Sequence, residues 1–190
     1  MLVLRSMKEM TDNELVSSYR DGNKLAFETL VNRHLKAVYF YCVRLVGKEE
    51  ANDMAQEVFI KVWKKLNRYD VEKNFRVWLF RIARNTCLDW LRKKRSILFS
   101  DLKKEEDVSV EENIPEQRKG IEEELLAADQ KNELDSALLK LSVPEQEVFE
   151  LYYRDELNFQ EIAEALKLSI NTVKSRHRRG LQELRKMISG

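Results

Sequence analysis

The sequence predicts an all-α protein with two small helical domains joined by an acidic flexible linker, and with a helix-turn-helix in the second domain. Among its 190 residues only five are glycine and two are proline, the residues that interrupt helices. Apolar residues recur at steps of three and four along most of the chain, which is the period of an amphipathic helix. Between residues 96 and 120 this period fades and acidic residues dominate, which divides the chain into domains over 1–95 and 121–190.

The first domain is expected to begin with a short helix. Thr11 is a candidate N-cap, and Glu14 stands at the N3 position from which its carboxylate can reach back to the N-cap, completing a capping box. The Asp21–Gly22 pair should end this helix. The next helix extends to Gly47 and carries apolar residues over too much of its surface to lie free in solvent. We therefore expect the second helix to lie in the domain core.

A third helix, predicted over residues 49–66, separates polar from apolar side chains. Asp53, Gln56 and Glu57 share its polar face. A partly acidic stripe on a rigid helix can orient a basic partner surface. The alternative interpretation is an ordinary solvated helix face.

Residues 67–74 have no helical period and are expected to form a loop. A helix resumes over residues 75–94, where aromatic residues alternate with positive charge. Such a surface can stack unpaired bases while its guanidinium groups follow the backbone, each stacked base contributing about 1–3 kcal/mol. Trp78 also falls on an apolar stripe with Leu79 and Ile82, so burial in the core is the competing interpretation for this residue.

The linker expected over residues 96–120 has seven acidic residues against four basic ones, and Pro115 interrupts any helix there. A solvated tether is its most economical interpretation. After the linker a helix is expected over residues 121–141, and Pro144 stands in the first turn of another.

Residues 158–184 carry the most informative pattern. Asn158 and Glu161 predict a second capping box, which opens a short helix that ends near Lys167. Ser169 then caps a helix whose basic residues face outward. Two short helices with this turn and charge are typical of a helix-turn-helix, whose second helix fits the major groove of DNA. A helical hairpin with a solvated basic face is the alternative.

No constellation for catalysis, for a metal ion or for a cofactor stands out, which indicates a protein that is not an enzyme. His34 and His177 are the only histidines, and neither has a cysteine or carboxylate at a recognisable spacing. Cys42 and Cys87 lie in apolar helical settings and are expected to pack as small buried hydrophobes. No apolar run approaches the roughly 18 residues of a membrane span, which predicts no direct membrane insertion and a cytoplasmic location.

Three segments together resemble a known family. They begin with AFETLVNRHLKAVYFYC at residue 26, with FRVWLFRIARN at residue 75 and with LSVPEQEVFELYYRD at residue 141. In this order and spacing they resemble a bacterial sigma-70 family RNA polymerase sigma factor of the extracytoplasmic function (ECF) group. The resemblance implies a sigma-2 domain over 1–95 and a sigma-4 domain over 121–190, which bind core RNA polymerase and direct it to promoters.

The resemblance also implies roles for individual residues. Four match a segment that docks on the clamp helices of the largest polymerase subunit: Asp53, Gln56, Glu57 and Phe59. Six match the part that melts the minus 10 element and captures an extruded base: Arg76, Arg81, Arg84, Asn85, Arg92 and Lys93. Six more would contact the minus 35 element: Thr172, Lys174, Ser175, Arg176, Arg178 and Arg179.

The expectation is therefore a monomeric alternative sigma factor that performs no bond chemistry and needs no cofactor. Its implied partners are core RNA polymerase, promoter DNA and an anti-sigma factor, which can hold it at the membrane. A conventional helix-turn-helix regulator that binds paired half-sites as a dimer would leave the segment from Asp53 to Asn85 unexplained. A sigma-like interaction or decoy protein is the other alternative, and the basic residues at both DNA surfaces argue against it.

Overall fold

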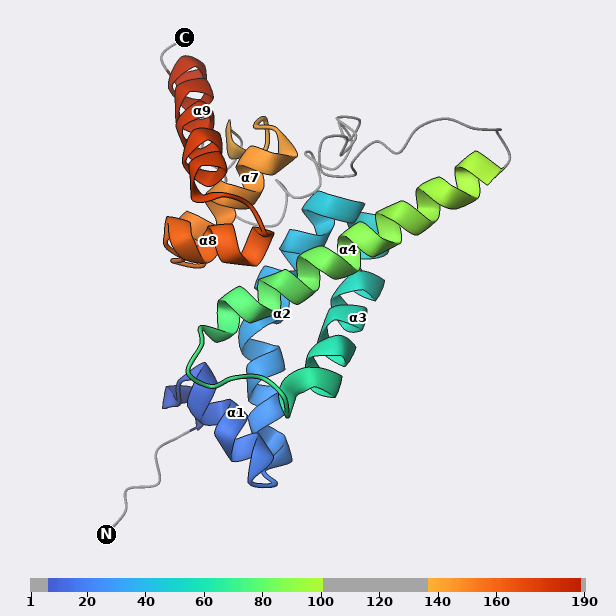
Figure 1. Ribbon diagram of the computed structural model, residues 1–190, viewed down its shortest axis with the longest axis vertical. Coiled ribbons are helices and arrows are strands. Elements are labelled where there is room, and N and C mark those ends of the chain that lie inside the picture. The colour runs from blue at the N-terminus through green and yellow to red at the C-terminus, as the bar shows by residue number, and fades with distance from the viewer. Residues whose placement is uncertain (1–6, 101–136, 189–190) are drawn as a thin grey trace.

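The computed structural model describes residues 7–100 and 137–188, and every element in these two ranges is helical (Figure 1). The first range forms an N-terminal bundle: η1 (Met7–Glu9), α1 (Asp12–Arg20), α2 (Lys24–Val46), α3 (Lys48–Leu66) and α4 (Phe75–Ser100). The second forms a C-terminal unit: α7 (Val143–Phe149), η2 (Glu150–Arg154), α8 (Phe159–Leu166) and α9 (Ile170–Ile188).

Local signals fix the start of the bundle. The predicted capping box is present, because Thr11 Oγ1 accepts from the Glu14 amide at 3.2 Å and Glu14 Oε2 accepts from the Thr11 amide at 2.6 Å. The first turn of α1 is also tied to α2, since Asp12 contacts His34 Nε2 at 2.9 Å and Arg33 Nη1 at 2.6 Å. Burial raises the pKa of Asp12, but the hydrogen bonds and the positive charges of these two partners together outweigh it and leave the pKa lowered.

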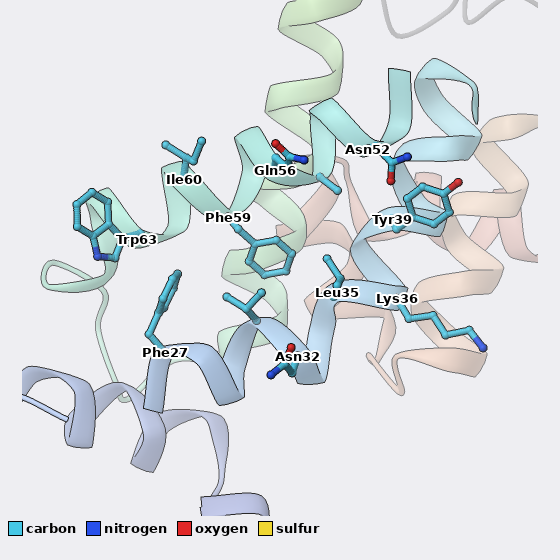
Figure 2. A pocket seen from close by; sticks show the side chains of 12 residues that line it. Phe27, Asn32, Leu35, Lys36, Tyr39, Asn52, Gln56, Phe59, Ile60 and Trp63 are labelled. Atoms are coloured by element: carbon cyan, nitrogen blue, oxygen red, sulfur yellow. The ribbon is translucent and has the colours of Figure 1, made fainter. Parts of the chain in front are cut away.

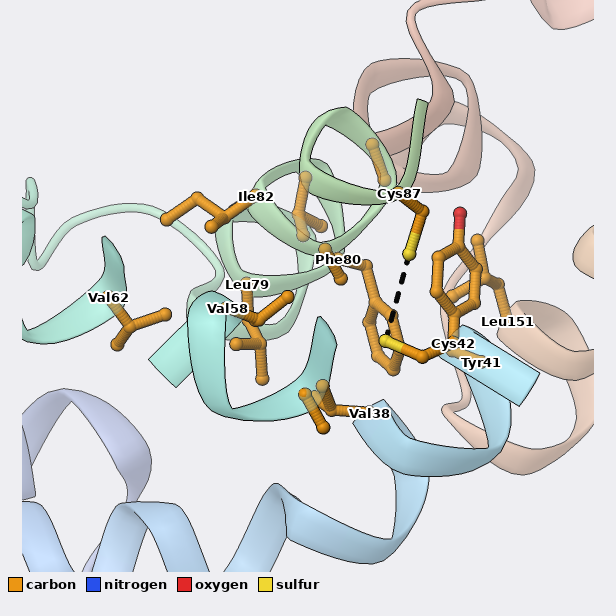
Figure 3. Packing of buried hydrophobic residues seen from close by; sticks show 14 of the residues in the cluster. Val38, Tyr41, Cys42, Val58, Val62, Leu79, Phe80, Ile82, Cys87 and Leu151 are labelled. Atoms are coloured by element: carbon orange, nitrogen blue, oxygen red, sulfur yellow. Dashed lines mark hydrogen bonds between the residues drawn. The ribbon is translucent and has the colours of Figure 1, made fainter. Parts of the chain in front are cut away.

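The bundle core lies where α2, α3 and α4 pack together (Figure 3). Val58 of α3 and Phe80 of α4 are fully buried there, and the Phe80 ring meets Tyr41 of α2 edge-on at 5.4 Å. Cys42 and Cys87 lie in the same core, with their sulfurs 3.7 Å apart and both thiols free. The predicted packing role of the two cysteines is confirmed by this burial.

The helix α4 is longer than its sequence pattern predicts. It ends at Ser100 rather than at residue 94, so the first residues of the expected linker continue the helix. The rest of that linker, and the predicted helix over 121–141 up to residue 136, lie outside the described residues. Ala137 and Leu141 are buried against Phe149 and Leu184 at the start of the C-terminal unit.

Caps and one left-handed residue shape the C-terminal unit. Pro144 stands in the first turn of α7, which Ser142 and Glu145 cap, and the helix then widens into the π-helical turn η2. Asn158 Oδ1 accepts from the amides of Gln160 and Glu161 at 2.9 and 3.0 Å, which confirms the predicted cap of α8. Lys167 adopts φ 53° and ψ 43°, the left-handed conformation that a helix-turn-helix requires at this point.

The C-terminal unit packs directly on the bundle. In Figure 1, α8 lies beside the N-terminal half of α4, and α9 extends away from the bundle. Leu151, Leu157 and Ile162 of the C-terminal unit are each at most 2% exposed and belong to the same apolar cluster as the bundle core. The two parts therefore share one hydrophobic interior in this structure.

Candidate docking and nucleic-acid surfaces

The outer face of α9 carries the residues predicted to read duplex DNA. Lys174, Arg178 and Arg179 are exposed, and Thr172, Ser175 and Arg176 are half-buried. At the start of the helix, the Ser169 hydroxyl accepts from the Thr172 amide at 3.1 Å, which confirms the predicted cap. Arg179 Nε lies 3.8 Å from Glu145 Oε1 of α7, so this side chain is drawn toward the neighbouring helix.

An aromatic cluster beneath α9 fixes its position. The His177 ring stacks on Phe149 at 5.1 Å, and its Nε2 shares a 3.1 Å hydrogen bond with the Tyr153 hydroxyl. Burial lowers the pKa of His177, because an imidazole packed among aromatic rings is less readily charged. A Cβ at Gly180 would stand 2.5 Å from Phe149, so a glycine is needed for α9 to approach the ring so closely.

An apolar groove lies between α2 and α3 (Figure 2). Its volume is about 960 Å³, and Phe27, Leu35, Ile60 and Trp63 are among the residues that line it. The last three are exposed, Trp63 to 53%. Side chains of this size are rarely left in water without a partner, so the groove has the composition of a protein-docking site.

The predicted polar stripe of α3 borders this groove. Asp53 and Gln56 are exposed, and Glu57 is half-buried with its carboxylate 3.4 Å from Lys61 Nζ. Phe59 is only 9% exposed and contributes to the groove wall together with Gln56 (Figure 2). The sequence interpretation missed Ile60 and Trp63, although both depart from the buried stripe of α3.

The predicted DNA-binding basic residues of α4 divide into two groups. Arg92 and Lys93, near its C-terminal end, are exposed. The other three predicted arginines contact the C-terminal unit, with Arg76 and Arg81 half-buried and Arg84 buried: Arg76 donates to the Asp155 backbone oxygen at 2.9 Å, Arg81 to Glu164 Oε1 at 2.7 Å, and Arg84 Nε lies 3.8 Å from Glu147 Oε1. Asn85, the one uncharged member of the six residues predicted to contact the minus 10 element, is half-buried between these two groups.

The loop before α4 is held rigidly by the bundle. Asn13 Nδ2 donates to the Val71 backbone oxygen at 2.7 Å, and the Tyr69 ring packs against Trp78 at 4.8 Å. Trp78 is half-buried and packs against the core, so it is only partly in the buried position that the apolar stripe predicts. A cavity of about 480 Å³ opens beside the loop, with Lys73, Asn74 and Arg76 in its wall.

Residues 7–100 and 137–188 contain no group of three or more histidine, cysteine or acidic side chains placed to hold a metal ion. His34 does have a carboxylate partner, Asp12, which the sequence interpretation missed because 22 residues separate them. Within the same described ranges, no helix combines the length and the apolar character that crossing a bilayer requires.

Two family models match the chain. One, described as Sigma-70 region 2, matches residues 30–97, and the other, described as Sigma-70, region 4, matches residues 131–184. The chain is also 31% identical over 183 residues to the ECF RNA polymerase sigma factor SigW of Bacillus subtilis, and the match covers 95% of this chain and 98% of that relative.

Solved structures share the arrangement of helices. The structure of CnrH in complex with the cytosolic domain of CnrY has a TM-score of 0.63 at 25% identity and covers 94% of this chain and 97% of that chain. The sigma factor RpoE of Bartonella quintana, solved in complex with the anti-sigma factor NepR, has a TM-score of 0.62 at 24% identity, with 86% and 96% covered.

Proposed function

This chain is a sigma-70 family RNA polymerase sigma factor of the ECF group, and we propose how its surfaces divide the work of promoter-specific transcription initiation. The N-terminal bundle, with residues 1–95 as the sigma-2 domain, docks on core polymerase and holds the melted minus 10 element. The C-terminal unit, within a sigma-4 domain over 121–190, reads the minus 35 element. Residues 96–120 connect them.

The docking surface on core polymerase combines the α2–α3 groove with the polar stripe beside it. Trp63 and Ile60 supply exposed apolar area, the kind of anchor that carries most of the affinity in protein interfaces. Asp53 and Gln56 are exposed at its border and supply orientation, because charged rims steer encounter more than they add affinity. An apolar groove with a polar border therefore supports a polymerase-docking role for this surface.

The α4 helix and the loop 67–74 form the single-strand surface. Arg92 and Lys93 are positioned in solvent for phosphates, and Asn85 carries an amide that can donate and accept along a base edge. The free energy for strand opening would come from binding, because capture of an unstacked base stabilises the open DNA over the closed duplex. No bond chemistry is required of this protein.

The α9 helix supplies the duplex contacts. Lys174 and Arg178 are exposed on one face of a helix whose start is capped and whose inner face is locked by the aromatic cluster. A rigid basic helix of this kind fits the major groove. We assign base contacts to Lys174, Ser175, Arg178 and Arg179, and phosphate contacts to Thr172 and Arg176.

We also propose that the factor acts in the cytoplasm and has a protein regulator of the anti-sigma type. The similar protein CnrH binds the cytosolic domain of CnrY, which supports a partner of this kind for the present chain. The groove between α2 and α3 is the surface such a partner would cover to exclude polymerase, because its apolar residues are exposed in the free chain.

The single observation that carries the proposal is that one chain holds an apolar docking groove and two separate basic helices, α4 and α9. The test is reconstituted transcription with purified core polymerase on fragmented genomic DNA. We expect initiation at a limited set of promoters, and the absence of any specific start site would contradict the proposal. Asn85→Ala should then reduce promoter melting while the affinity for core polymerase is unchanged.

A further inference from the structure

Helix α1 holds the loop 67–74 through its side chains, although the function proposed above gives α1 no role. Asn13 Nδ2 donates to the Val71 backbone oxygen at 2.7 Å and to the Lys73 backbone oxygen at 3.1 Å. Its Oδ1 accepts from the Tyr69 hydroxyl at 3.0 Å, and this hydroxyl also contacts the Lys73 backbone oxygen. Both ends of the Asn13 amide are therefore committed to the loop.

A second residue of α1 holds the start of the loop. Arg20 Nη2 donates to the Leu66 backbone oxygen at 2.9 Å and also to the Tyr69 backbone oxygen. Leu66 is the last residue of α3, and the last carbonyl groups of a helix have no donor within the helix. The guanidinium of Arg20 thus joins the end of α3 to the first turn of the loop.

The bundle fixes the position of both α1 and the loop. Asp12, in the first turn of α1, contacts Arg33 Nη1 at 2.6 Å and the buried His34 at 2.9 Å. The Tyr69 ring is 4% exposed and packs edge-on at 5.5 Å against Phe75, the first residue of α4. The loop is therefore tied to α1 on one side and to the start of α4 on the other.

These contacts order a segment that has no repeating backbone hydrogen bonds. An irregular segment loses conformational entropy when a ligand orders it. Here four residues give backbone oxygens to side chains of α1: Leu66, Tyr69, Val71 and Lys73. The loop is thus ordered on folding, and a strand that binds it does not have to order it. A fixed surface also discriminates better than a mobile one, which can rearrange around a wrong base.

We propose that Asn13 and Arg20 are positioning residues for base selection in the minus 10 element, and that they act through the loop 67–74. The inference rests on the strand-binding role proposed above for this loop and α4. Neither side chain needs to contact DNA, because each acts on the backbone of the loop. Loss of either one should therefore reduce the preference for one base over another more than the total affinity for a single strand.

The test uses the full chain assembled with purified core polymerase. Asn13→Asp keeps the shape of the side chain but removes both donors, and an acidic residue in the first turn suits the helix dipole. The matched control is Ser17→Asp, which adds the same charge one turn along α1, where the Ser17 hydroxyl donates to the Asn13 backbone oxygen at 3.0 Å. Arg20→Gln removes the second contact independently.

The probe is a single-stranded DNA library with about six adjacent randomised bases between constant flanks, selected on each complex and sequenced. Core polymerase alone gives the background. We expect the parent complex to enrich particular bases. Asn13→Asp and Arg20→Gln should each reduce the strongest preference about tenfold, while the affinity for the unselected library changes by less than about threefold. Ser17→Asp should retain the preferences of the parent complex.

Hydrogen exchange of the free chains reports whether the loop has been released. The amides of residues 67–74 should exchange about tenfold faster in Asn13→Asp and Arg20→Gln than in the parent chain, with exchange in α2 unchanged. Faster loop exchange together with reduced base preference supports the inference. Unchanged base preference in both variants overturns it. Unchanged loop exchange overturns it as well, because the two side chains then do not hold the loop.

Failure of the inference is distinguishable from failure of the proposed function. If the parent complex enriches no base above the background of core polymerase alone, the strand-binding role is wrong and the inference fails with it. If the parent complex selects bases and both variants select the same ones to the same extent, the role stands and the positioning by α1 is wrong.

Discussion

Tyr41 of α2 donates a 2.7 Å hydrogen bond to Glu147 of α7, and both side chains are buried although 106 residues separate them in sequence. Burial, together with the nearby Glu147 carboxylate, raises the pKa of the Tyr41 hydroxyl well above its ordinary value, so it remains a donor throughout the physiological range. This bond joins the N-terminal bundle to the C-terminal unit at the centre of their contact.

Tyr41→Phe removes this donor from a buried carboxylate. We expect the free energy of unfolding to fall by about 1–3 kcal/mol, because a buried polar group that loses a hydrogen bond retains its desolvation cost. Equilibrium denaturation in urea measures the change. The control is Tyr19→Phe, whose ring is half-buried against Phe27 at 5.7 Å. An equal effect of both substitutions would show that the hydroxyl of Tyr41 contributes nothing specific.

Asp155 makes the stability depend on pH. Burial and the neighbouring Glu150 raise its pKa from 3.8 to about 7. Because the folded protein then holds a proton that the unfolded chain has released, this contribution to stability is complete below pH 3.8 and is lost as the pH rises toward about 7. As the pH rises through this window, the melting temperature of Asp155→Asn should therefore increase relative to that of the parent chain. Asp53→Asn, at an exposed site, should show no such trend.

Gly180 tests the packing beneath α9. Alanine normally stabilises a helix interior relative to glycine by roughly 1 kcal/mol. At Gly180 the added methyl group would stand 2.5 Å from Phe149, so we expect Gly180→Ala to destabilise the protein by about 1–3 kcal/mol. Thermal unfolding measures the effect, and Phe149→Leu in the same chain should recover part of it. Stabilisation by Gly180→Ala would contradict the close contact.

The groove between α2 and α3 is tested by Trp63→Ala. The side chain is 53% exposed, so the free energy of unfolding should change by less than about 0.5 kcal/mol. The affinity for core polymerase should fall by about 2 kcal/mol or more if this indole is an interface anchor. Titration of labelled core polymerase measures the loss, and Lys64→Ala, the exposed neighbour, provides the control. Unchanged affinity would remove the groove from the docking surface.

The α9 residues can be sorted by their salt dependence. Arg178→Ala should cost about 1–3 kcal/mol on the cognate upstream element if the side chain reads a base, with a smaller loss on unrelated duplexes. Arg176→Ala should weaken binding to all duplexes alike and lower the slope of affinity against salt by about one. Fluorescence anisotropy at several salt concentrations separates the two. Lys186→Ala, in the last turn of α9, is the control.

The sequence predicted the features that depend on neighbours along the chain. The caps at Thr11 and Asn158, the stop at Gly47 and the turn at Lys167 each arise from contacts within a few residues, and the structure confirms them. The two-part helical organisation also follows from apolar periodicity and from the acidic stretch between the parts.

The sequence could not predict how the two parts meet. Arg81 and Arg84 read as a basic face because local pattern does not reveal that Glu164 and Glu147 lie opposite them. The Asp12–His34 pair is invisible for the same reason. Trp63 was missed because it lies off the buried stripe of α3, where a single exposed hydrophobic residue is common and does not by itself indicate a docking site.

The neighbouring sulfurs of Cys42 and Cys87 allow the opening of the bundle core to be measured. They are the only thiols in the chain, and both are completely buried. The hydrogen bond to Cys42, together with burial, raises the pKa of the Cys87 thiol and so disfavours the reactive thiolate. Because both thiols are buried, a thiol reagent can reach them only when the bundle core opens transiently. The rate at which an unmodified chain takes up such a reagent thus reports the frequency of core opening, without an engineered label.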